Sequence, residues 1–201
     1  GRERLGLSRA DLSIPEKQAC AAIGQSFLMH TYEKAFEKKD IKVAQILLSH
    51  DDLGNRRRYL NAKHTIEALL ERNVIPIINE NDSVTVEEIK IGDNDTLSAT
   101  VACLVDAQLL IILSDVEGLF NRDPSIKIKG EKAELLSHVA RVNDEIERTA
   151  GKSNNKLTVG GMYTKVIAAK KTMSFGIPTL VVNGLDEKVL ENIFSGKDVG
   201  T

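Results

Sequence analysis

Four short apolar runs, separated by stretches with helical periodicity, constrain the fold more than any other feature of this chain. The runs are continuous rather than alternating, and they lie at residues 42–48, 74–78, 109–113 and 178–182. Continuous apolar strands are typical of parallel sheets, because the connecting helices bury both faces of such a sheet. The sequence therefore predicts an α/β protein with a mostly parallel central sheet and helices on both faces, a three-layer sandwich.

The segments between the runs carry helix signals. Ser13 and Glu16 have the spacing of a capping box, and Pro15 falls in the first turn that would follow. We expect helices at residues 13–38, 55–72, 94–105, 143–150, 162–175 and 186–194. Ligands of such folds bind beyond the carboxyl ends of the strands. The residues just after each apolar run are therefore candidates for a site.

Composition excludes several classes of protein. The chain has 201 residues, 42% hydrophobic and 28% charged, which is typical of a folded domain. A net charge of −2 argues against a nucleic-acid or anionic-membrane binder. No apolar run approaches the roughly 18 residues of a membrane span, the four histidines lack metal-ligand spacing, and the two cysteines indicate thiols of a reducing cytosol. We expect one domain over residues 1–201, in the cytoplasm and without a protein-bound metal site.

The richest polar segment, residues 79–95, surrounds the end of the second apolar run. Its carboxylates can hold a metal–nucleotide complex or orient cationic groups. The pairs Asn81-Asp82 and Asp93-Asn94 together offer acceptors for an ammonium group and donors for a carboxylate, as a zwitterionic amino acid requires. Asp93 and Asn94 also stand at a predicted helix start, so plain N-capping remains the alternative.

A second segment, residues 158–165, leads a glycine pair directly into a predicted helix. Gly160 and Gly161 allow the backbone to approach a phosphate, and free N–H groups at a helix start attract anions. Lys165 in the first turn is unfavourable against the helix dipole. A lysine at this position is favourable if a bound polyphosphate supplies the opposing charge. The chain contains neither GxxxxGK[ST] nor GxGxxG, which disfavours a dinucleotide oxidoreductase.

Together these strings resemble the amino acid kinase superfamily. They are NEND followed by IGDND in residues 79–95, LSDVEGLF at 113–120 with Asp123-Pro124, and GGMYTK at 160–165. INENDSV and GDNDTLSA are specific to the glutamate 5-kinases within it, whereas SDVEGLF and GGMYTK are shared with aspartate, acetylglutamate and uridylate kinases. The resemblance covers essentially the whole chain.

The resemblance implies an enzyme that uses ATP and Mg²⁺ to phosphorylate the side-chain carboxylate of L-glutamate. The product is glutamyl 5-phosphate, the first intermediate of proline synthesis. The resemblance also implies a homo-oligomer and feedback inhibition by proline. A carboxylate nucleophile is already ionised at pH 7 and needs no general base, so the lack of a catalytic histidine is no objection.

The resemblance also implies roles for particular residues. Lys165 would neutralise charge on the transferred phosphoryl group, and Asp95 would hold Lys165 and a second lysine in place. Glutamate would bind at Asn79, Asp82, Asp93 and Asn94. The nucleotide would bind at Ser114, Asp115, Val159, Gly160, Gly161, Met162, Tyr163, Thr164 and Lys165.

Two departures from the family pattern are visible. The family opens with a strand, a lysine-containing Gly/Ser loop and a Ser-Ser-Gly segment, none of which is in this sequence. We therefore expect the domain to lack its N-terminal strand and phosphate loop, and with them the second lysine. The C-terminal RNA-binding-like PUA domain of many relatives is not in view either.

Two alternative functions remain open. The chain could be another member of the superfamily, similar to acetylglutamate, aspartate or uridylate kinases and acting on a different acceptor. It could also be a binding module for a nucleotide or an amino acid, without turnover.

Overall fold

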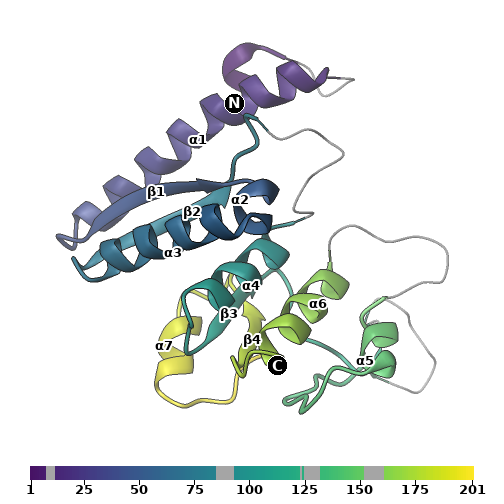
Figure 1. Cartoon of the computed structure of the whole chain (residues 1–201). Helices are drawn as coiled ribbons and strands as arrows, with labels where there is room; N and C mark the ends of the chain where they lie inside the picture. Colours follow the sequence, from purple (N-terminus) through teal and green to yellow (C-terminus); the bar gives the residue numbers. More distant parts are fainter. Residues whose placement is uncertain (8–11, 85–92, 123, 125–131, 152–160) are drawn as a thin grey trace. The chain divides into compact units, whose positions relative to one another are not determined.

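The computed structural model describes residues 1–7, 12–84, 93–122, 124, 132–151 and 161–201 of the chain (Figure 1). These residues form two compact units, Gly1–Asn94 and Asp95–Thr201. Each unit contains one pair of parallel strands with helices packed against it. The α/β class with parallel strands is therefore confirmed, and the four described strands form two pairs.

The first unit is built around the pair β1 and β2. Its elements are η1 (Glu3–Leu5), α1 (Ile14–Glu37), β1 (Lys42–Leu48), α2 (His50–Gly54), α3 (Arg56–Leu70) and β2 (Val74–Glu80). The strands run parallel, with Lys42 opposite Val74 and Leu48 opposite Glu80. Helix α1 packs against β1 and α3 packs against β2 (Figure 1).

The start of α1 follows the predicted capping box. The backbone N–H and the hydroxyl of Ser13 donate hydrogen bonds to Oε2 of Glu16 at 2.8 and 2.7 Å. Both bonds lower the pKa of Glu16 from its ordinary value of 4.5, and the bond from the hydroxyl has the larger effect. Pro15 lies in the first turn, where its missing N–H costs no hydrogen bond.

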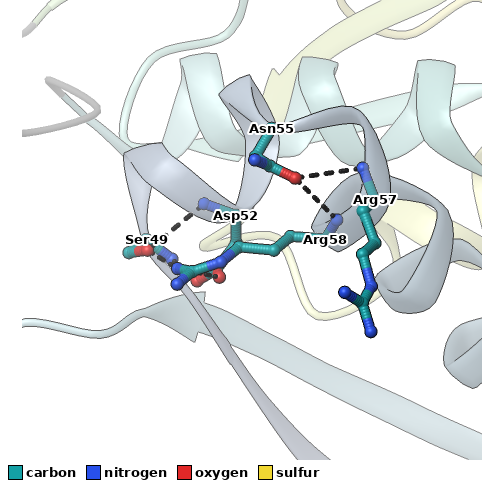
Figure 2. A network of polar contacts seen from close by, with 5 residues as sticks. All are labelled: Ser49, Asp52, Asn55, Arg57 and Arg58. Atoms are coloured by element: carbon teal, nitrogen blue, oxygen red, sulfur yellow. Dashed lines mark hydrogen bonds and ion pairs between the residues drawn. The ribbon is translucent and has the colours of Figure 1, made fainter.

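After β1 the chain turns through two helices whose starts are both capped by side chains (Figure 2). The backbone N–H and hydroxyl of Ser49 donate to Oδ2 of Asp52 at 2.8 and 2.6 Å. Oδ1 of Asn55 accepts from the backbone N–H groups of Arg57 and Arg58 at 3.0 and 3.2 Å. The Arg58 guanidinium pairs with Asp52 at 3.2 Å. The polar residues after this strand therefore serve as helix caps, and α2 is an element that sequence analysis missed.

The second unit is built around the pair β3 and β4. Its elements are α4 (Asn94–Leu104, which starts at the last residue of the first unit), β3 (Leu110–Ser114), α5 (Asp144–Thr149), α6 (Met162–Met173), β4 (Thr179–Asn183) and α7 (Val189–Phe194). Leu110 lies opposite Thr179 and Ser114 opposite Asn183 in the parallel register. The N–H of Gly184 donates to the carbonyl of Ser114 at 2.7 Å and extends the pairing by one bond.

Two buried clusters hold the second unit together. The first joins α4, α6 and the two strands through Ala99, Ala168, Ile112 and Val181. The second lies beside α6 and consists of Leu119, Val142, Ala150 and Val166. Alanine on both helices allows them to approach the strands closely, so α4 and α6 are fixed against the same pair.

An ion pair connects α5 to α6. The carboxylate of Glu147, on α5, is buried, and it accepts a hydrogen bond from Nζ of the half-exposed Lys170 on α6. A buried carboxylate is costly without a partner, so this contact fixes the position of α5.

No helix in the described parts of the chain is long and apolar enough to cross a membrane.

Candidate active site

The start of α6 carries a largely buried ion pair with α4. Nζ of Lys165 donates to Oδ2 of Asp95 at 2.9 Å, and the side chains are only 14% and 17% exposed. The hydroxyl of Thr164 donates to the same oxygen at 2.7 Å. Residues 70 positions apart are thus held at one point, because α4 and α6 pack on the same strands.

This pair revises one sequence argument. The unfavourable charge of a lysine near the start of α6 predicts an opposing charge from a bound polyphosphate. In the structure, the carboxylate of Asp95 provides an opposing charge. The contact between Lys165 and Asp95 is the one that the resemblance implies, and the catalytic roles of the two residues stay predictions.

The first turn of α6 is open to an anion. Gly161, at the N-cap, has a φ of 94°, a backbone conformation that favours glycine. Among the described residues, no side chain caps this end, and the first turn contains no acidic residue. The first N–H groups of a helix have no partner within the helix and carry partial positive charge, and Lys165 follows them on the same helix.

A cavity of about 600 Å³ opens at this helix start, within the second unit. Five of the residues predicted to bind nucleotide line it: Ser114, Asp115, Gly161, Met162 and Lys165. The remaining walls come from the segment after β3 and from the end of α5. A cavity of this size is within the range of small-molecule sites.

The other residues predicted to bind the nucleotide are not among the described lining residues of this cavity. Tyr163 packs on the second buried cluster, beside Val166, and is not among the described lining residues. Thr164 binds Asp95, as described above. Val159 and Gly160 lie outside the described residues.

The cavity also contains lining residues that sequence analysis did not assign a role. They are Val116, Gly118, Leu119, Phe120, Arg122, Pro124, Thr149, Ala150 and Gly151. Val116 to Phe120 belong to the SDVEGLF string, so the motif itself was the available signal. The end of α5 carries no such signal, because its place at the cavity depends on packing against α6.

A second cavity, of about 340 Å³, shares Leu119, Met162 and Lys165 with the first. Its other walls are mostly apolar and come from α6, β4 and residues 138–146. The polar side chains of Thr179 and Thr201 also line it. Lys165 therefore lines both cavities.

In the first unit, one of the residues predicted to bind the substrate glutamate lines a much smaller cavity. Asp82 lines a cavity of about 30 Å³ at the end of β2, together with Glu80, Asn81, Ser83 and Gln25. Asn79 is not in that lining. Its Nδ2 donates to Oε1 of Gln25 at 3.0 Å, and Gln25 comes from α1. Gln25, which sequence analysis did not single out, is thus common to Asn79 and the Asp82 cavity.

Asp93 and Asn94 stand at the beginning of α4. Asp93 immediately precedes the helix and is half-buried, while Asn94 is its first residue and is exposed. These are the positions that the capping alternative predicts. Their binding of glutamate stays a prediction.

Metal ligands are sparse in the described residues. They contain no group of three or more histidine, cysteine, aspartate or glutamate side chains placed to hold a metal ion. Asp115 is the only carboxylate among the described lining residues of the larger cavity. Mg²⁺ in phosphoryl-transfer sites needs only one or two carboxylates, because substrate phosphates and water provide the other ligands. The donor set therefore fits a Mg²⁺ ion that arrives with a nucleotide.

Comparison with known proteins agrees with the fold and with the strings that form the site. The model of the amino acid kinase family matches residues 2–183, through both compact units. The chain belongs to the amino acid kinase family.

Within that family, the resemblance to glutamate 5-kinases is confirmed. The chain is 51% identical, over all 201 residues, to the glutamate 5-kinase of Geobacter sulfurreducens and to that of Clostridium tetani. It spans 53% of the length of the first protein and 74% of the second. The chain thus spans about half the length of several of these relatives.

Solved structures show the same fold at low sequence identity. A UMP kinase from Bacillus anthracis matches 100% of this chain and 71% of its own, with a TM-score of 0.57 and 17% identity. A carbamate kinase from Giardia lamblia bound to AMP-PNP matches 100% of this chain and 79% of its own, with a TM-score of 0.60 and 13% identity.

Proposed function

We propose that the protein containing this chain transfers the γ-phosphoryl group of ATP to the side-chain carboxylate of L-glutamate. The observation that carries the proposal is the cavity at the start of α6, which Gly161 and Lys165 line. The choice of glutamate rests on the 51% identity to glutamate 5-kinases across the whole chain.

The second unit would bind the nucleotide. Gly161 and Met162 begin the helix whose N–H groups would bind phosphate oxygens, and Lys165 would neutralise charge that grows during transfer. Asp95 keeps the ammonium group of Lys165 in one position. Ser114 and Asp115, which line the same cavity, would also contact the nucleotide. Mg²⁺ would neutralise phosphate charge, with Asp115 as the available protein ligand.

The acceptor would bind through Asn79, Asp82, Asp93 and Asn94. In the reaction, an oxygen of the ionised glutamate carboxylate attacks the γ-phosphorus, an O–P bond forms, and the bond to the β-phosphate oxygen breaks. ADP leaves and glutamyl 5-phosphate remains. No proton has to be removed from the nucleophile. Catalysis then consists of aligning two anions and neutralising their charge.

Turnover by the full-length protein tests the proposal. ADP release is measured with Mg-ATP and, in separate reactions, L-glutamate, L-aspartate, N-acetylglutamate and UMP. The acyl phosphate is trapped with hydroxylamine as the hydroxamate. We expect ADP release and hydroxamate with L-glutamate above all. Preference for N-acetylglutamate, aspartate or UMP would assign a different acceptor, and binding without turnover would favour a non-catalytic module.

The same resemblance supports three further proposals: a homo-oligomer, a cytoplasmic location and inhibition by proline. Sedimentation of the full-length protein tests the first, and localisation of a fluorescent fusion in cells tests the second. Addition of proline to the ADP-release assay tests the third, and we expect proline to lower the rate.

A further inference from the structure

Thr201 connects β4 to the wall of the larger cavity. Its backbone N–H and carbonyl exchange two hydrogen bonds with Val181 of β4, at 3.0 and 2.9 Å. Its hydroxyl oxygen accepts a hydrogen bond from the backbone N–H of Leu119 at 2.9 Å, across 82 positions of sequence. Leu119 is 4% exposed, so water has little access to this N–H group.

The fit around this hydroxyl is tight. A Cβ atom added to Gly118 would lie 2.5 Å from Oγ1 of Thr201, closer than real Cβ contacts allow. Glycine at position 118 therefore lets the loop approach Thr201 closely enough for the bond to Leu119. Gly118 and Leu119 both line the larger cavity, whereas Thr201 does not.

The loop after β3 that contains Gly118 and Leu119 is also held by residues 135–136. The carbonyl of Leu119 accepts from the N–H of Leu136 at 2.8 Å, and Phe120 forms an isolated antiparallel bridge with Leu135. Thr201 joins β4 to this loop, because its backbone pairs with Val181 while its hydroxyl contacts the N–H and the carbonyl oxygen of Leu119 at 2.9 and 3.5 Å. Without its hydroxyl, the Leu119 N–H would lose its described partner in a nearly dry place, which is costly.

We propose that Thr201 is a positioning residue for the nucleotide: through Leu119, its hydroxyl holds the Gly118–Leu119 wall of the cavity in the binding conformation. Thr201 touches neither the nucleotide nor the acceptor in this account. The inference rests on the proposed function, because it takes the larger cavity as the nucleotide site. It predicts that loss of the hydroxyl weakens nucleotide binding more than acceptor binding.

The test measures the Kd of Mg-AMP-PNP by calorimetry for four full-length proteins: wild type, Thr201→Val, Thr201→Ser and Thr172→Val. Valine keeps the shape of threonine without the hydroxyl, and serine keeps the hydroxyl. Thr172→Val is the matched control, since Thr172 is fully buried and its hydroxyl contacts Thr179 between α6 and β4, away from the larger cavity. Thermal melting of each protein and KM values for both substrates are recorded in parallel.

We expect Thr201→Val to raise the Kd of Mg-AMP-PNP on the order of 3- to 10-fold, a part of the cost of an unpaired buried N–H. Thr201→Ser should bind as wild type, the KM for glutamate should stay within about twofold, and Thr172→Val should lower Tm without changing Kd. Equal Kd values for wild type and Thr201→Val would overturn the inference and leave the proposed function intact. A wild-type protein that binds no nucleotide would overturn both.

If Thr201→Val fails to fold, Gly118→Ala replaces it, because the added Cβ would displace the same hydroxyl. The same rise in Kd supports the inference, and an unchanged Kd contradicts it.

Discussion

The two compact units present their candidate residues in different ways. In Asp95–Thr201, side chains from α4, α6 and the segment after β3 lie at or beside one cavity of about 600 Å³. In Gly1–Asn94, the candidates follow one another along the end of β2 and the start of α4, and the cavity at Asp82 measures about 30 Å³. That smaller volume holds one or two water molecules.

The two units therefore hold the residues of the two proposed sites in different ways. The proposed nucleotide residues depend on packing within the second unit, since Lys165 is fixed by Asp95 and both helices share a core. The proposed acceptor residues are short polar side chains, and one of them, Asn79, binds Gln25 of α1. Substitutions in the second unit should therefore act on the phosphoryl group, and those in the first on glutamate.

The largest effect is expected for Lys165→Ala in the full-length protein. Lys165 would meet charge that grows in the transition state, so kcat should fall on the order of 10²-fold or more while the KM for glutamate changes little. Steady-state kinetics measure both constants. Lys197→Ala is the control, because Lys197 lies at the surface and its Nζ donates to Oδ1 of Asn192, in the same C-terminal segment. A kcat for Lys165→Ala equal to that of the control would move Lys165 to a purely structural role.

A smaller loss is expected for Asp95→Asn. The amide keeps an oxygen acceptor for Lys165 and Thr164 but removes the charge that holds the ammonium group. Loss of a hydrogen bond to a charged group costs about 1.5–3 kcal/mol, so kcat should fall roughly 10-fold or more, by less than in Lys165→Ala. Thr164→Ser is the control, because serine keeps the hydroxyl that donates to Asp95, and its kcat should stay close to that of wild type. If Asp95→Asn retains full kcat, the ion pair is not needed for transfer.

Asp82→Ala and Asn94→Ala test the first unit. Each should weaken glutamate binding about 10-fold, the scale of one charge-assisted hydrogen bond, and leave nucleotide binding nearly intact. Calorimetry with each ligand separately measures both effects. Asp51→Ala, an exposed carboxylate on α2, is the control. Equal losses of both ligands would mean that these residues hold local structure instead.

The smallest effect concerns stability at the α2 cap. The hydroxyl of Ser49 is the largest cause that holds the pKa of Asp52 below its ordinary 3.8, ahead of the Arg58 charge. A carboxyl whose pKa is lowered on folding adds stability above the unfolded-state pKa, and this stability is lost as pH falls through the folded-state pKa. Ser49→Ala should therefore cost about 1 kcal/mol at pH 7 and less below pH 3.8. Denaturant unfolding at several pH values measures the free energy of unfolding. Ser26→Ala, a substitution at an exposed serine, is the control and should show no such pH dependence.

The sequence predicts the elements well where a local pattern defines them. The strand at residues 42–48 is found with its predicted bounds, and its apolar run ends at the polar Ser49. Helix α1 begins at the predicted capping box. Helix α2 was missed because five residues are too few for a periodic pattern, although Ser49 and Asp52 have capping-box spacing.

The site is only partly predictable, because its contacts are distant in sequence. The motifs predicted Lys165, Gly161 and Ser114 as neighbours of one cavity. They could not predict that Thr201 reaches Leu119, since nothing local to either residue signals a contact across 82 positions. The family string also includes Tyr163, which packs against the second buried cluster, and its nucleotide role stays a prediction.

The central claim is that nucleotide and glutamate bind through different units. Two calorimetric titrations, Mg-AMP-PNP and L-glutamate, on wild type, Thr201→Val and Asp82→Ala test it most directly. The account predicts a crossed pattern: Thr201→Val weakens only the nucleotide, and Asp82→Ala weakens only glutamate. Parallel losses of both ligands in both variants, with wild-type Tm values, would contradict it.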